Sequence, residues 1–159
     1  MKTELMYLLL CAILTSVLWI PVVIGYSSAR GLPKRADYKK APTTPLPDWV
    51  NRANRAHLNA VENFAQFAAV VLIANAMGLT SPLTQACAAV YFYARLAHAV
   101  IHVSGFGRFR ARTVTFTVAW IAFITYAVTL LVRAILPIGA ALVAGPTGCT
   151  GWPPRFKLL

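Results

Sequence analysis

The fold is decided by a stretch in the middle of the chain, residues 52–77, which reads RANRAHLNAVENFAQFAAVVLIANAM. Its first part, as far as Asn63, carries arginine, asparagine and glutamate side chains, and the run from Phe64 to Met77 carries no charge. The uncharged run is typical of a lipid-embedded helix, in which Arg, Asn and Glu are costly and therefore rarely accidental. The stretch predicts a membrane span that opens with a functional site.

The composition of the whole chain supports a membrane protein. Of its 159 residues, 58% are hydrophobic and 12% are charged, against about 45–50% and about 25% in soluble domains. The net charge is +11, and the basic residues cluster in residues 30–55 and 108–112. Because these clusters lie between apolar segments, they indicate cytoplasmic loops near anionic lipid and argue against a nucleic-acid-binding protein.

Four apolar segments are long enough to cross a bilayer core of about 30 Å at about 1.5 Å per residue. In the first of them Pro21 predicts a kink, and its length argues against a cleaved signal peptide, whose apolar core is about 7–15 residues. A Pro/Gly-rich tail, residues 137–159, follows a single membrane domain, residues 1–136. The predicted spans are residues 5–26, 47–77, 83–103 and 112–136.

Loop charges predict the orientation of these spans. The first and third connectors are strongly basic, and the second, residues 78–82, has no charge. The positive-inside rule places both basic connectors in the cytoplasm and both termini on the opposite side. The predicted fold is an all-α, antiparallel bundle of four transmembrane helices.

Polar side chains recur at helical spacing on the last three spans. Because the second and fourth spans start at the basic side and the third ends there, their polar residues are expected at a similar depth. Such a pocket would be rich in cations, with Glu62 as the only carboxylate expected within the spans, and an anionic ligand would correct the imbalance. The stripes are Arg55, Asn59, Glu62 and Gln66; then Arg95, His98 and His102; then Arg112 and Thr113.

Structural explanations compete with this hypothesis. Arg55 and Glu62 could form a buried ion pair that fixes the bundle, and Arg52, Arg108 and Arg110 could be snorkelling anchors. His98 and His102 could bind a metal, but no third ligand is evident, so no metal site is predicted. The three cysteines, Cys11, Cys87 and Cys149, are too few and too scattered for a disulfide framework, and buried thiols are expected.

The polar stretches resemble the signature of the MAPEG family, the membrane-associated proteins in eicosanoid and glutathione metabolism. The resemblance rests on Arg52 to Phe64, on ARLAHAVIH at residues 94–102, and on the Arg-Thr pair that opens the last span. It covers about residues 5–135 and is strongest to bacterial members, which implies an inner-membrane protein. It further implies a homotrimer with glutathione bound near the cytosolic face, between neighbouring subunits.

The resemblance also implies roles for individual residues. Arg55, Asn59 and Glu62 match positions that hold glutathione, with Glu62 suited to its amino group and Arg55 to a carboxylate. Arg95 and His98 match binding positions on the third span. The catalytic candidates near the thiol are Arg112, Thr113 and His102. Arg108 and Arg110 are alternatives to Arg112 as the group that stabilises the thiolate.

The chain departs from many catalytic relatives at three positions. Those relatives carry tyrosine at the positions of His102 and Phe116, and a second arginine at that of Leu58. The first hypothesis remains a glutathione-dependent transferase or peroxidase that acts on an apolar electrophile or lipid-derived substrate from the membrane. The alternatives are a non-catalytic lipid-binding or partner-presenting protein, which the three departures favour, and a small ion-coupled transporter.

Overall fold

The computed structural model describes residues 2–32, 34, 35, 37, 39, 44–107 and 110–143, with side chains as far as residue 136. The described part is all helical, and four of its helical segments are long and apolar enough to cross a membrane. These segments confirm the all-α fold class, and their number equals that of the predicted spans. Arg108, Cys149 and the tail from residue 144, all named above, lie outside the described part.

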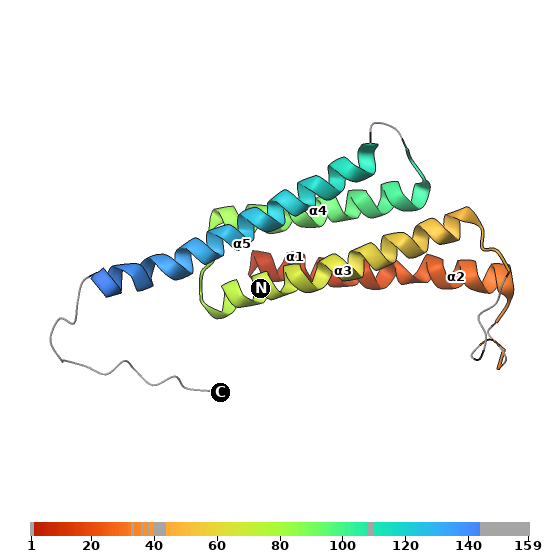
Figure 1. Ribbon diagram of the computed structural model, residues 1–159, viewed down its shortest axis with the longest axis horizontal. Helices are drawn as coiled ribbons and strands as arrows, with labels where there is room; N and C mark the ends of the chain where they lie inside the picture. The colour runs from red at the N-terminus through yellow and green to blue at the C-terminus, as the bar shows by residue number, and fades with distance from the viewer. Residues whose placement is uncertain are drawn as a thin grey trace.

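The helices run antiparallel along one axis (Figure 1). Both basic connectors lie at one end of the bundle, and the N terminus and the far end of the last helix lie at the other. We call these the connector end and the N-terminal end. The helices are α1 (Thr3–Val17), α2 (Trp19–Arg30), α3 (Asp48–Ala76), α4 (Pro82–Ser104) and α5 (Ala111–Val143).

The first span consists of two helices that meet near Pro21. Pro21 has no N–H to donate to the carbonyl four residues earlier, at Val17. The span divides at Leu18 into α1 and α2, three residues before the proline that predicts a kink. The last apolar span, Ala111–Leu136, agrees with the prediction of residues 112–136. Its helix, α5, nevertheless continues through Pro137 to Val143, into the segment expected to be an irregular tail.

The turn between the second and third spans follows the predicted signals. Gly78 adopts a φ of 67° after the end of α3, a left-handed conformation that glycine adopts without steric cost. Ser81 then caps α4 through a capping box with Thr84, and Pro82 occupies the first helical turn. Gly105 ends α4 with a φ of 75°, as expected for a helix C-terminus.

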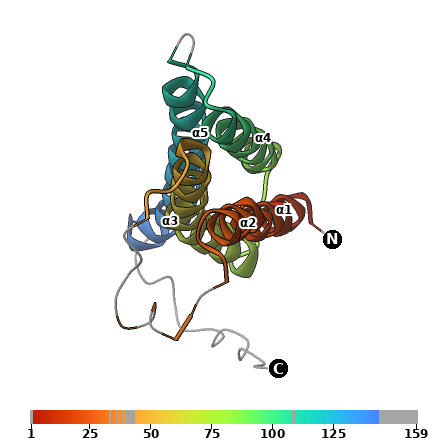
Figure 2. The same ribbon diagram turned by 90° about the vertical axis from the view of Figure 1, so that its right-hand side faces the viewer.

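The helices pack around an apolar core at the centre of the bundle. Phe67 of α3 and Tyr91 of α4 are buried and stack with their ring centroids 3.9 Å apart. The Tyr91 hydroxyl donates to the backbone carbonyl of Asn63 at 2.9 Å, so its polar atom is satisfied. Cys11 and Cys87 are free and buried, as expected from the sequence. An end view shows α4 against α5, and α1 and α2 beside α3 (Figure 2).

Two further carboxylates, Glu4 and Asp48, lie within the apolar helical segments, which corrects the expectation that Glu62 is the only one. Asp48 is exposed in the first turn of α3, whereas Glu4 is buried. Glu4 is 2% exposed at the start of α1. Its Oε1 accepts a hydrogen bond from the Thr84 hydroxyl at 3.0 Å, at the N-terminus of α4. The positive end of a helix dipole stabilises such a carboxylate. The sequence analysis missed it because Glu4 precedes the apolar run and appeared to be a flanking residue.

Close packing of α2 on α3 depends on Gly25. A Cβ atom at this position would lie 2.5 Å from Cγ2 of Val50, which is fully buried and has stiff, β-branched rotamers. We expect Gly25→Ala to lower the free energy of unfolding by about 1–3 kcal/mol, as overpacking does. Thermal unfolding in detergent measures this effect. Gly107→Ala is the control, since a Cβ there meets nothing within 4 Å; equal melting temperatures for the two variants would contradict the prediction.

Candidate functional site

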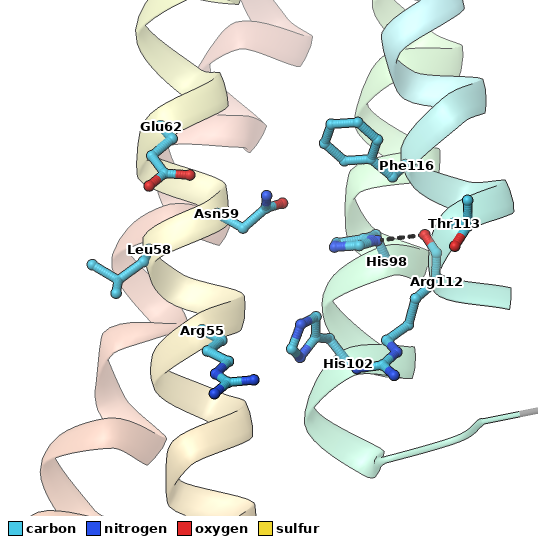
Figure 3. A pocket seen from close by; sticks show the side chains of 9 residues that line it. All are labelled: Arg55, Leu58, Asn59, Glu62, His98, His102, Arg112, Thr113 and Phe116. Carbon is cyan, nitrogen blue, oxygen red and sulfur yellow. Dashed lines mark hydrogen bonds between the residues drawn. The ribbon is translucent and has the colours of Figure 1, made fainter. Parts of the chain in front are cut away.

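A pocket of about 570 Å³ opens at the connector end, between α3 on one side and α4 and α5 on the other. It forms where α3 and α5 have few contacts with each other, although α4 packs extensively on α5. Figure 3 shows side chains from all three helices directed into it. The lining residues are Arg55, Leu58, Asn59, Glu62, His98, His102, Arg112, Thr113 and Phe116.

The structure brings together every residue predicted for the site except Arg95. The two predicted stripes on α3 and α4 face each other across the pocket, and α5 contributes its first turn. Gln66, at the end of the α3 stripe, does not line the pocket. Of the three arginines that the sequence left open, Arg112 lines the pocket, Arg110 does not, and Arg108 lies outside the described residues.

Leu58 and Phe116 also line the pocket, although the sequence analysis named them only as departures from the family pattern. Leu58 lies three residues after Arg55 on α3, and Phe116 lies four residues after Arg112 on α5. These spacings place each on the same helix face as its polar neighbour. Their helical spacing from Arg55 and Arg112 is therefore the sequence signal that could have predicted that Leu58 and Phe116 line the pocket.

The charges in the pocket are not neutralised by one another. Arg55 and Arg112 face a single carboxylate, that of Glu62. In the part of the chain that the structure describes, no ion pair joins Glu62 to either arginine. Figure 3 shows the Arg55 side chain extending away from Glu62. The buried Arg55–Glu62 ion pair considered above is therefore absent from the described structure. The excess positive charge gives the pocket an affinity for anions.

Arg95 lies behind the pocket wall. It is 6% exposed, and its Nη2 donates to the backbone carbonyl and to Oδ1 of Asn59, at 2.8 and 2.9 Å. Because the amide oxygen of Asn59 is bound in this way, its NH₂ group is left to donate to a ligand. Arg95 therefore positions a pocket residue, and its Nη1 has no hydrogen-bond partner among the described residues.

The two histidines of α4 differ in their partners. Nδ1 of His98 lies 3.0 Å from the backbone carbonyl of Arg112, an obligatory acceptor, so Nδ1 carries the proton and ties α4 to the start of α5. Nδ1 of His102 is buried with no partner in the described part of the chain. A buried polar atom without a partner is costly, so this nitrogen is available to bind a ligand or a water molecule.

Other polar residues near the pocket have structural roles. The Arg52 Nε donates to the Val103 carbonyl at the C-terminus of α4, at 3.4 Å, where a cation is favourable. Nδ1 of His57 lies 3.2 Å from the Thr15 carbonyl on α1, so His57 faces another helix. Among the described residues, no third His, Cys, Asp or Glu joins His98 and His102 in a metal-binding cluster.

The fold and the pocket define a multi-pass membrane protein with a cation-rich pocket at one end of a bundle of four spans. The sequence matches the MAPEG family over residues 5–132, and the chain belongs to that family. The match includes all of the pocket-lining residues. Comparison with curated proteins found no significant match.

Proposed function

We propose that the chain is a glutathione-dependent transferase or peroxidase that binds glutathione in the pocket between α3 and α5. The observation that carries the proposal is the charge imbalance of that pocket, in which two arginines face one carboxylate. Glutathione offers the complementary pattern, with two carboxylates, one ammonium group and a thiol. The volume of about 570 Å³ lies within the range of about 300–1,000 Å³ typical of small-molecule sites.

The pocket residues have separate roles in this proposal. Glu62 binds the ammonium group, Arg55 binds a carboxylate, and the Asn59 amide donates to the peptide. Arg112 lies beside the sulfur and favours its thiolate form by opposite charge. Thr113 and the unpartnered His102 are the remaining groups that can hydrogen-bond to the sulfur or to the reacting oxygen.

The chemistry follows from the thiolate. In conjugation, a carbon–sulfur bond forms, the leaving group departs with its electron pair, and the thiol proton passes to water. In peroxide reduction, two glutathione molecules become one disulfide while the peroxide yields an alcohol and water. The pocket orients the thiolate towards an electrophile that enters from the bilayer, and Arg112 stabilises the negative charge on the sulfur.

The open side of the pocket is consistent with a homotrimer, as the family resemblance implies. Arg55, Glu62 and Arg112 are exposed in the single chain, and a neighbouring subunit would cover them and exclude water. We also propose the cytoplasmic side for the connector end, because its basic residues follow the positive-inside rule. Crosslinking of the purified protein in mild detergent would reveal the trimer.

Leu58 favours a second candidate, a non-catalytic lipid-binding or partner-presenting protein. Its side chain is 49% exposed on the pocket wall, at a position where many catalytic relatives carry a second arginine. An apolar wall residue suits an acyl chain better than a carboxylate. A transporter has less support, because α3 runs unbroken from Asp48 to Ala76, whereas transporter sites commonly interrupt their helices near the midplane.

Two measurements test the proposed function. The purified protein in detergent is expected to bind glutathione by calorimetry and to conjugate a generic aromatic electrophile in its presence. Thiolate formation is expected to appear as ultraviolet absorbance when glutathione is added. Glutathione binding without turnover would support the non-catalytic candidate. If glutathione does not bind, both the proposed ligand and the proposed glutathione-dependent activity are refuted.

A further inference from the structure

A small cavity lies inside the bundle, behind the wall of the pocket described above. It has a volume of about 10 Å³ and is lined by α1, α3 and α4, and most of its lining residues are buried. His98 lines both this cavity and the larger pocket, so the two spaces share one side chain. The residues that bring polar atoms or a thiol to the cavity are Cys11, Thr15, Tyr91, Arg95 and His98.

Arg95 brings an unpartnered donor to this cavity. Its side chain is buried, and its Nη1 has no hydrogen-bond partner among the described residues. The other terminal nitrogen, Nη2, donates to Asn59 in the wall of the pocket. Burial of an unpaired donor is costly, so an acceptor held in the cavity would stabilise Arg95 in the orientation that it has.

The other polar groups of the cavity offer acceptors, because their own protons are already donated elsewhere. The Thr15 hydroxyl donates to the Cys11 carbonyl at 2.9 Å. The Tyr91 hydroxyl donates to the Asn63 carbonyl, also at 2.9 Å. The proton of His98 lies on Nδ1, as described above, which leaves Nε2 as an acceptor. The hydroxyl oxygens of Thr15 and Tyr91 likewise keep lone pairs that can accept.

This combination of groups selects the chemical class of the occupant. The occupant must accept a hydrogen bond from Arg95 and donate hydrogen bonds to oxygen. The guanidinium would repel a cation, and an anion would face the lone pairs of the two hydroxyl oxygens. A water molecule both accepts and donates, and about 10–15 Å³ is enough space for one.

We propose that this cavity holds a single water molecule, which accepts a hydrogen bond from Nη1 of Arg95 and donates to the hydroxyl oxygens of Thr15 and Tyr91. About three hydrogen bonds are usual for a buried water. Thr15 is itself fixed on α3, because its carbonyl lies 3.2 Å from Nδ1 of His57. The water therefore connects α1 to Arg95 and, through Arg95, to the Asn59 amide in the pocket.

X-ray radiolytic labelling followed by mass spectrometry tests this site in the full-length protein in detergent. Radicals formed from a bound water oxidise the side chains beside it, and Cys11 lines the cavity whereas Cys87 does not. The exposed fractions, 4% for Cys11 and 7% for Cys87, would by themselves make Cys87 the more reactive. A bound water reverses that order, so Cys11 is expected to be oxidised several-fold faster. Equal rates, or faster oxidation of Cys87, would overturn the proposal.

Two variants test the assigned partners of the water. Thr15→Val removes one acceptor with little change in volume and is expected to lower Cys11 oxidation several-fold. Thr129→Val is the matched control, since the Thr129 hydroxyl also donates to the carbonyl four residues earlier and Thr129 does not line the cavity. Arg95→Met removes the donor and is expected to reduce Cys11 oxidation to the rate of Cys87. Wild-type oxidation of Cys11 in Thr15→Val or in Arg95→Met would contradict the site.

The effect of the water on the pocket rests on the proposed function and is measured separately. Thr15→Val is expected to weaken glutathione binding several-fold by calorimetry, because Arg95 then orients the Asn59 amide less firmly, and Thr129→Val to leave it unchanged. Equal affinities of the two variants would refute the positioning role of the water. If Cys11 of the wild type is oxidised as expected but glutathione does not bind, the proposed function is refuted and the water site is retained.

Discussion

Replacing Arg112 by alanine is expected to lower the rate of glutathione conjugation by about 100-fold or more, since loss of one donor that stabilises developing charge typically costs about 10²–10³. The guanidinium lines the pocket, and the hydrogen bond from His98 goes to the Arg112 backbone carbonyl, which alanine retains. The bundle should therefore stay folded. Initial rates with an aromatic electrophile, together with thiolate absorbance, measure the effect.

Arg110→Ala is the matched control for this prediction. Arg110 has the same charge two residues earlier and does not line the pocket. Its variant is expected to keep wild-type rates and thiolate absorbance, whereas Arg112→Lys should recover part of the activity because it restores a point charge without the guanidinium geometry. Equal losses in the alanine variants at 110 and 112 would mean that the connector acts through its overall charge and would remove Arg112 from the reaction.

The sequence predicted the spans well because their boundaries follow from strong local signals. Uncharged runs of sufficient length, the Gly78 and Pro82 turn signals and the Pro21 break all act within one or two helical turns. The depth of the polar groups was also predictable, since the direction of each span fixes which of its ends lies at the connector side. That reasoning placed Asn59, His98 and Arg112 in one pocket, where the structure has them.

The remaining features depend on helix packing, which spacing along one helix does not specify. Arg95 shares a stripe with His98 and His102, yet it lies one turn deeper, where α3 and α4 are in contact and its guanidinium is enclosed. Glu4 is buried only because the N-terminus of α4 packs beside it. The small cavity behind the pocket wall requires α1, α3 and α4 to meet at one place, and that arrangement has no local sequence signal.

Arg95→Met is expected to weaken glutathione binding about tenfold or more without lowering the free energy of unfolding of the bundle. The surroundings of Arg95 explain why affinity and stability respond differently. The guanidinium is buried without a carboxylate partner, and its Nη1 is unsatisfied in the described structure. A buried charge without a partner carries a desolvation penalty of several kcal/mol, so an apolar side chain of similar length is expected to cost little stability here. Binding suffers because Asn59 loses both hydrogen bonds that orient its amide.

A double-mutant cycle with Asn59→Ala distinguishes this positioning role from a direct contact with the ligand. If Arg95 acts only through the Asn59 amide, both variants remove the same hydrogen bond between Asn59 and glutathione. Arg95→Met should then have little further effect on glutathione affinity in the Asn59→Ala background. Calorimetric titration of the wild type, both single variants and the double variant gives the coupling. Additive losses would instead show that Arg95 reaches the ligand itself, and a fall in melting temperature that parallels the loss of affinity would show that its role is structural.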